Sequence, residues 1–137
     1  MLAEERLHNV IRSSQAVVRS GRYAYLKTQT PPTLGNHFLV AQDQDEVTVV
    51  TEEANVAQSS FEEDVKWFKL IEVQVSQPFV VQGFIASIAR AIAQEKLNIL
   101  VVSTFSKDYF LIREQSIDIA VTALRNLGFP LAVEGPG

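Results

Sequence analysis

Cysteine is absent from this chain of 137 residues. Its absence excludes disulfide bonds, thiolate nucleophiles and metal sites built on cysteine. Proteins of the reducing cytosol do without disulfides, so the composition favours a cytoplasmic protein.

Long apolar runs and a basic surface are also lacking. No stretch approaches the roughly 18 apolar residues that a membrane-spanning helix requires, and the acidic start at residues 1–6 leads into no apolar core of a signal peptide. The 12 basic residues are scattered among 16 acidic ones, for a net charge of −4, and they form no stripe that could follow a phosphate backbone. We expect neither a membrane nor a nucleic acid as partner.

Motifs for catalysis and metal binding are missing too. His8 and His37 have no metal-ligand spacing to each other or to acidic residues, and the chain has no phosphate loop, nucleophile elbow or His-Glu-x-x-His. Asp43, Asp45 and Glu46 are crowded carboxylates that could attract a cation, but they lack the fuller oxygen set of a calcium loop. The sequence therefore predicts no enzyme, no cofactor and no metal site.

What is present is the composition of a globular domain, with 47% hydrophobic and 20% charged residues. Apolar residues at helical spacing over 2–14 predict a short helix. β-rich runs follow on both sides of a turn signal at 20–22, and strands at 38–41 and 47–50 form a hairpin. The acidic stretch 51–65 is expected to be a solvated loop.

The C-terminal half has a clearer pattern. A strand that starts at Lys66 and stops at Pro78 precedes an amphipathic helix at about 82–95. The near-continuous apolar run 98–103 is typical of a strand that is buried on both faces or lies in the centre of a sheet, and 108–113 is its hairpin partner.

A second helix is expected to begin at the N-cap residue Ser116 and to end at Gly128, before an edge strand at 129–133. The order over 66–133 is strand, helix, strand, strand, helix, strand, which predicts the α+β class and a ferredoxin-like antiparallel sheet with both helices on one face. The opposite face then requires a cover.

An internal repeat links the two halves. Residues 41–52 align without gaps onto residues 103–114, and Glu46 then falls opposite Asp108. Where the first copy would need a helix it has only residues 30–36, which include two prolines. The N-terminal half is therefore interpreted as a degenerate version of the C-terminal half.

The chain resembles the small bacterial proteins with tandem ACT domains. The most specific part of the family pattern, Ser-Thr-(Tyr/Phe)-x-x-Asp-Tyr-hydrophobic-Leu-Val, is matched by Ser103, Thr104, Phe105, Asp108, Tyr109, Leu111 and Ile112. Upstream, Phe79, Gly83 and residues 85–89 match the family's Phe-x-x-x-Gly and the helix that follows it, and residues 45–50 match its Asp-Glu-Leu-Ser-Val-Val.

This resemblance implies two ferredoxin-like (βαββαβ) ACT modules with antiparallel sheets. The degenerate N-terminal module would cover 15–64 after an N-terminal extension at 1–14, and the ACT domain would cover 65–133, with a frayed tail at 134–137.

ACT domains typically bind small molecules, mostly amino acids, at an interface between two modules, so the resemblance implies a regulatory module without catalysis. Its ligand-binding residues would be Phe79, Val80, Val81, Gly83, Thr104, Phe105 and Asp108. Backbone donors at 80–83 would receive a carboxylate, and Asp108 would accept the amino group. Thr104 would add a hydrogen bond, and Phe105 an apolar wall.

Each of these residues also has a structural explanation. Gly83 could relieve crowding where helix meets strand, and Phe79 could be a core residue. Asp108 could be a hairpin turn residue, while Thr104 and Phe105 could only terminate a strand. The alternative function is therefore a protein-interaction or oligomerisation module with a vestigial ligand site.

Departures from the family pattern bear on the ligand and on the fold. Gln77-Pro78 replaces Leu-Asp and Ser106 replaces an acid, so the ligand loop carries less negative charge. Lys96 stands where the family has glycine, in a conformation that costs lysine on the order of 1 kcal/mol. With either function we expect a homo-oligomer, most simply a homodimer, because an exposed face or edge of a small module is commonly covered by a symmetric partner.

Overall fold

The computed structural model describes residues 3–76 and 82–135. Its elements in chain order are α1 (Ala3–Ser13), β1 (Gln15–Val18), β2 (Tyr23–Thr28), β3 (Leu39–Gln42), β4 (Val47–Glu52), α2 (Glu53–Val56), β5 (Glu63–Gln74), α3 (Phe84–Gln94), β6 (Leu100–Ser103), β7 (Asp108–Arg113), the 3₁₀ turn η1 (Glu114–Ser116), α4 (Ile117–Leu127) and β8 (Leu131–Val133). None of the helices in these two ranges is both long and apolar enough to cross a bilayer.

The long strand β5 organises the sheet. Its first half pairs antiparallel with β2, its second half pairs antiparallel with β1, and β7 pairs along its other edge. β1 and β2 therefore follow one another along the same edge of β5. The segment 20–22, expected as a turn, bends the chain without reversing it, and Gly21 has a φ of 81° there.

The strand order around the C-terminal part of β5 is β8-β1-β5-β7-β6. The expected order of elements over 66–133 is confirmed by β5, α3, β6, β7, α4 and β8. β1 lies between β5 and β8 and runs parallel to β8, which departs from a purely antiparallel sheet. Ala16 and Val18 of β1 are buried in the main core. The position of β1 between β5 and β8 therefore removes their apolar surface from water.

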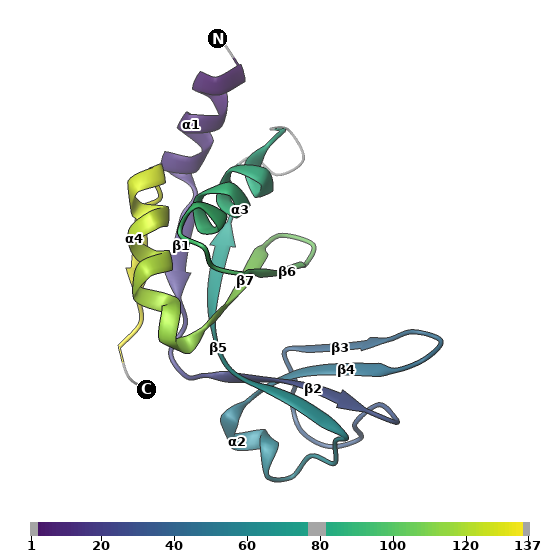
Figure 1. The fold of residues 1–137 in the computed structure, drawn as a ribbon. Coiled ribbons are helices and arrows are strands. Elements are labelled where there is room, and N and C mark those ends of the chain that lie inside the picture. The colour runs from purple at the N-terminus through teal and green to yellow at the C-terminus, as the bar shows by residue number, and fades with distance from the viewer. Residues whose placement is uncertain (1–2, 77–81, 136–137) are drawn as a thin grey trace.

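Helices α1, α3 and α4 lie on one face of this sheet (Figure 1). The main core between helices and sheet combines apolar residues from all of these elements, among them Val10, Ile71, Ile88, Phe110 and Leu124. The three-to-four-residue spacing of Phe84, Ile88 and Ile92 buries one stripe of α3 here.

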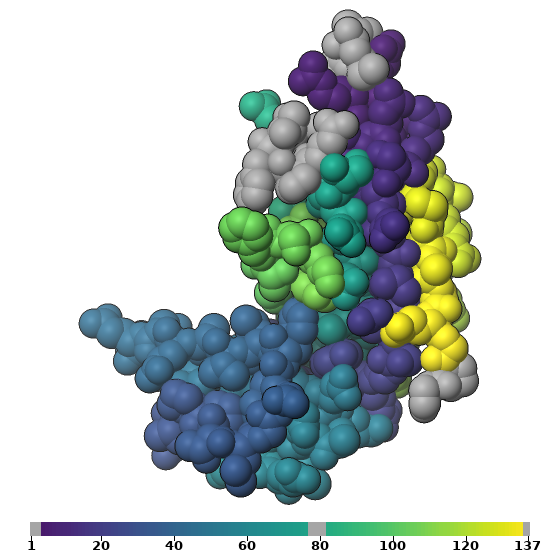
Figure 2. Space-filling view, turned by 180° about the vertical axis from the view of Figure 1, so that it is seen from behind, coloured from purple at the N-terminus to yellow at the C-terminus, as the bar shows by residue number. Residues whose placement is uncertain are grey.

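The residues 23–62, called here the arm, contact the opposite face of the sheet. Phe38 packs edge-on against Tyr109 with ring centroids 4.7 Å apart, and Leu39 belongs to the same cluster as Leu70 and Leu111. The space-filling view shows the arm projecting sideways from the helical body (Figure 2). Part of the cover that the sheet requires therefore comes from the chain itself.

The expected solvated loop at 51–65 is wrong in part. This stretch contains the end of β4, the helix α2 and the first residues of β5. Its acidic side chains Glu52, Glu53, Glu62 and Glu63 are nevertheless exposed. The acidic residues of this stretch thus predicted correctly that it is exposed. An exposed segment can nevertheless form a strand that pairs in a sheet.

The expected central strand at 98–103 is also wrong. β6 pairs with β7 alone among the described strands and forms the edge of the sheet. Leu100 is 37% exposed and Val101 41% exposed. An apolar run indicates that a strand can be buried, but it does not state how many neighbours the strand will have.

Candidate functional site

The expected ligand-binding residues that the structure describes lie at one end of the C-terminal sheet. Asp108 begins β7 and pairs with Val73, next to the last residue of β5. Gly83 precedes α3, the element that follows β5 in the chain. The helix start and the hairpin turn are therefore at the same end of β5. Phe79, Val80 and Val81 lie outside the described residues.

Gly83 has a backbone conformation that favours glycine. Its φ is 85°, and its carbonyl accepts the first helical hydrogen bond, from the N–H of Ser87 at 2.9 Å. A side-chain β carbon at this position would meet only Leu7 Cδ2 at 3.7 Å, an ordinary contact. The requirement for glycine is therefore the positive φ, and relief of crowding does not explain it.

The donors at the start of α3 lie further along the chain than expected. The helix begins at Phe84 instead of at about residue 82, so the N–H groups without an intrahelical acceptor are those of Phe84, Ile85 and Ala86. Gly83 has no side chain to cap them. These donors and the positive end of the helix dipole suit a carboxylate.

Asp108 already has a role in the hairpin. Its Oδ1 accepts a hydrogen bond from Ser103 Oγ at 2.6 Å, and these two residues form the pair that closes the β6–β7 hairpin. The turn is held by the N–H of Thr104, which donates to Lys107 O at 2.8 Å. The structural explanation for Asp108 is thus correct, and a carboxylate keeps further lone pairs for a ligand.

Phe105 does not form a wall within the chain. It lies at the tip of the hairpin with 94% of its surface exposed. Phe105 could therefore become a wall of a ligand site only where a second molecule covers it.

Charged groups of both signs lie on the face of the sheet opposite to Asp108, because Glu72 lies opposite Tyr109, whereas Asp108 lies opposite Val73 of the main core. Glu72 pairs with Arg19 (Nε–Oε1, 3.5 Å) and with Lys107 (Nζ–Oε2, 3.7 Å). Burial raises the pKa of the Tyr109 hydroxyl, and the charge of Glu72 raises it further. Because of this alternation, these ion pairs do not face a ligand bound at Asp108.

The β3–β4 and β6–β7 hairpins have loops of the same length, but they do not align in the way that the sequence repeat predicted. The closing pair is Gln42–Val47 in the arm and Ser103–Asp108 in the C-terminal sheet. Val47, and not Glu46, is therefore the structural counterpart of Asp108, so the gapless alignment is wrong by one residue. Such a slip moves every side chain to the other face.

The acidic turn of the arm uses its first carboxylate internally. Asp43 Oδ1 accepts the N–H groups of Asp45 at 2.8 Å and Glu46 at 2.9 Å. These two backbone donors lower the pKa of the Asp43 carboxyl. The carboxylate of Asp43 is thus explained by turn geometry.

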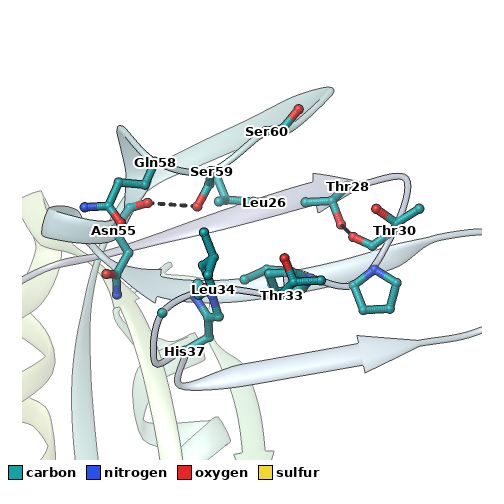
Figure 3. A pocket seen from close by; sticks show the side chains of 14 residues that line it. Leu26, Thr28, Thr30, Thr33, Leu34, His37, Asn55, Gln58, Ser59 and Ser60 are labelled. Carbon is teal, nitrogen blue, oxygen red and sulfur yellow. Dashed lines mark hydrogen bonds between the residues drawn. The ribbon is translucent and has the colours of Figure 1, made fainter.

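A cavity of about 240 Å³ lies in the arm, away from the expected residues (Figure 3). It is lined by the β2–β3 loop, by α2 and the segment that follows it, and by β2 and β4. The described lining residues are Leu26, Thr28, Thr30, Pro31, Pro32, Thr33, Leu34, Gly35, His37, Val49, Asn55, Gln58, Ser59 and Ser60. Sequence reasoning missed this cavity, although Pro31-Pro32 signalled the missing helix that makes room for it.

A comparison with protein families finds a match in the C-terminal part of the chain. Residues 62–126 match the family described as ACT domain. No curated protein matches the chain.

Solved structures share the fold over nearly the whole chain. A protein of unknown function from Vibrio cholerae, described as a possible transport protein, is 18% identical with a TM-score of 0.74 and covers 93% of this chain and 99% of its own. A protein from Agobacterium tumefaciens is 21% identical with a TM-score of 0.70 and covers 89% and 94%. The regulatory subunit of aspartate kinase from Thermus thermophilus is 8% identical with a TM-score of 0.63 and covers 86% and 97%. At these identities the likeness shows the fold alone.

Proposed function

We propose, from the ACT domain match over residues 62–126, that the chain is a regulatory module that binds an amino acid and catalyses no reaction. The arm and the segment before it would be a second, degenerate ACT module at 15–64, and the ligand would lie at an interface between modules. β5 spans the boundary between 64 and 65 and would belong to both modules. The likeness to a regulatory subunit of aspartate kinase supports this class of function.

One observation carries the proposal: the start of α3 and the Asp108 turn lie at the same end of β5. The N–H groups of Phe84–Ala86 would bind the carboxylate of the amino acid. The carboxylate of Asp108 would accept its ammonium group. Thr104 would add a hydrogen bond from the hairpin, and Phe105 would line the site where a second molecule covers the hairpin tip. Phe79, Val80 and Val81, which lie outside the described residues, would belong to the same site.

A thermal-shift screen of the twenty amino acids tests this function. A ligand that binds only the folded state raises the melting temperature by mass action, so a millimolar binder is detected at high concentration. We expect saturable stabilisation by at least one amino acid and its loss in Asp108→Ala. Asp45→Ala, at the exposed turn of the other hairpin, is the matched control and should retain the stabilisation. A flat screen with an intact fold would contradict amino-acid sensing.

A second function is favoured by the exposed edge of the same sheet. Leu100, Val101 and Phe105 are all exposed on the β6–β7 hairpin. An unpaired apolar strand is a template for pairing with another chain. If the amino-acid screen is flat, an oligomerisation or interaction module that uses β6 becomes the better explanation.

A further inference from the structure

The cavity in the arm exists because a helix is missing. In the C-terminal sheet α3 packs on the strands, whereas in the arm the link between β2 and β3 contains Pro31-Pro32 and forms no helix. The short helix α2 covers only part of β2 and β4. Space therefore remains above Leu26 and Val49, which form an apolar floor.

A hydrogen-bond network holds the loop of the cavity in place. His37 Nε2 lies 2.8 Å from Leu34 O, and a carbonyl oxygen can only accept, so Nε2 carries the proton. Nδ1 of the same ring lies 2.9 Å from the hydroxyl oxygen of the fully buried Thr51. Asn55 Nδ2 donates to Asn36 O and to Thr51 Oγ1, both at 3.0 Å. A site held in this way loses little freedom when a ligand binds.

The lining of the cavity is polar but uncharged. The described lining residues include no Asp, Glu, Lys or Arg. In the part of the chain that the structure describes, the side chains of Thr33, Gln58 and Ser60 have no protein hydrogen-bond partner. Figure 3 shows Thr33 and Leu34 projecting from the loop toward the segment that carries Ser59.

This chemistry selects against charged ligands. A carboxylate or ammonium group would lose hydration in the cavity and find no opposite charge there. A neutral molecule with several hydroxyl groups could exchange its hydrogen bonds to water for bonds to Thr33 and Gln58. Leu34, 79% exposed at the mouth, and the two proline rings could contact an apolar face of the molecule.

The volume limits the size of the ligand. A cavity of about 240 Å³ holds about eight waters at the volume that water has in the liquid. It therefore suits a molecule of about ten non-hydrogen atoms, which is the size of a pentose or hexose.

We infer that the arm binds a small, uncharged, hydroxyl-rich molecule of the monosaccharide or polyol class at the cavity between the β2–β3 loop and α2. This site is separate from the one at Gly83 and Asp108, and it does not depend on amino-acid binding there.

Chemical-shift mapping on the ¹⁵N-labelled full chain tests this site. The probes are D-ribose, D-glucose and myo-inositol, with gluconate and glucosamine as charged counterparts. We expect saturable shifts at the backbone amides of 30–37 and 55–60 with at least one neutral probe. Its charged counterparts should bind at least about tenfold more weakly, because they leave an uncompensated charge in the cavity.

Two variants localise the effect. Thr33→Phe places a ring in the cavity from an exposed loop position and should weaken binding about tenfold or more. Thr122→Phe, on the exposed side of α4, is the matched control and should bind like the unaltered chain. If Thr33→Phe fails to fold, the shift map of the unaltered chain decides.

Several outcomes would overturn the inference. They are the absence of saturable shifts with every neutral probe, tighter binding of gluconate or glucosamine, and unaltered affinity in a folded Thr33→Phe. Shifts confined to 82–86 and 103–108 would also overturn it, because they would place the probe at the other site. The amino-acid screen is independent, so either site can fail alone.

Discussion

Two helices end with the same hydrogen-bond motif but with different residues. At the end of α3, Leu97 N–H donates to Ile92 O and Lys96 N–H donates to Ala93 O. At the end of α4, the N–H groups of Phe129 and Gly128 make the corresponding bonds. This motif requires a positive φ, which glycine adopts at no steric cost. Lys96, with a φ of 61°, adopts it against its preference, as the sequence predicted.

Lys96→Gly should therefore stabilise the protein. Removing the side chain relieves the left-handed conformation, which costs an L-residue about 1 kcal/mol, and part of this gain is lost to the greater freedom of glycine in the unfolded chain. Urea unfolding measures the change. Glu95→Gly, at a φ of −87°, is the matched control and should destabilise. Equal effects of both changes would contradict this explanation.

A buried tyrosine makes stability depend on alkaline pH. Burial, and next the charge of Glu52, raise the pKa of Tyr23 to about 12. Its hydroxyl donates to Glu52 Oε1 at 3.2 Å. Above the ordinary pKa near 10, the unfolded state has lost this proton and the folded state keeps it, so stability falls as pH rises.

We expect the free energy of unfolding to decline between pH 10 and about pH 12. In Tyr23→Phe this decline should be absent. Urea unfolding at a series of pH values measures the decline, and tyrosinate absorbance follows the titration itself. Glu52→Gln should lower the pKa of Tyr23, because it removes the nearby negative charge. An unchanged pH profile in Tyr23→Phe would assign the decline to other groups.

At the scale of elements, the placement of β6 decides how the C-terminal sheet meets its surroundings. The same apolar residues would be inaccessible in a central strand, but at an edge they leave Leu100 and Val101 exposed. Natural edge strands often carry lysine, which discourages pairing with other chains. β6 has no charged residue, and it is therefore the element on which we base the prediction of a homodimer.

Val101→Lys tests whether β6 mediates self-association without contributing much to the stability of the chain. Because Val101 is exposed, its change should alter the free energy of unfolding by no more than about 0.5 kcal/mol, while self-association through β6 should be lost. Leu111→Lys, at a buried position of β7, is the contrasting variant and should unfold the chain. Sedimentation velocity and urea unfolding give the two readouts. A monomeric unaltered chain, or unfolding in Val101→Lys, would contradict this role of β6.

At the scale of the whole molecule, the segments before and after residue 62 depend on one another. β1 is the neighbour of β8, and Val10 and Ile11 of α1 belong to the main core. Arg22 joins the arm to the C-terminal part, because it pairs with Glu53 of α2 and with Glu114 of η1. The region that matches the ACT domain is therefore only part of the folding unit.

A fragment of residues 62–135 should not fold alone. It lacks α1 and β1, so β8 loses its partner strand and the main core loses the apolar side chains that α1 and β1 contribute. The dispersion of its amide spectrum and its circular dichroism measure folding. A peptide of residues 3–20, added to the fragment, should restore the native spectrum. A well-dispersed spectrum of the fragment alone would show that the C-terminal part is autonomous.

Part of the candidate site was predictable from the sequence. The positions of Gly83 and of the Asp108 turn were predictable from short stretches of sequence. A glycine before an amphipathic helix predicts the helix start, and a polar loop between two apolar runs predicts a hairpin. The pairing of β1 with β8 and the cavity above Leu26 were not predictable, because each joins segments that are distant in the chain.

The amino-acid sequence by itself determined the type and order of most of the elements, although the short helix α2 lies in a segment that was expected as a loop. The α+β class, both hairpins, the helices α3 and α4, and their ends at Lys96 and Gly128 depend on periodicity and backbone preference, which neighbouring residues specify. Only the tertiary structure decided which strands are neighbours. β1 lies beside β8, β6 lies at the edge, and the arm packs against part of one face of the sheet. Strand pairing depends on competition among apolar surfaces across the whole chain, and no local pattern records its outcome.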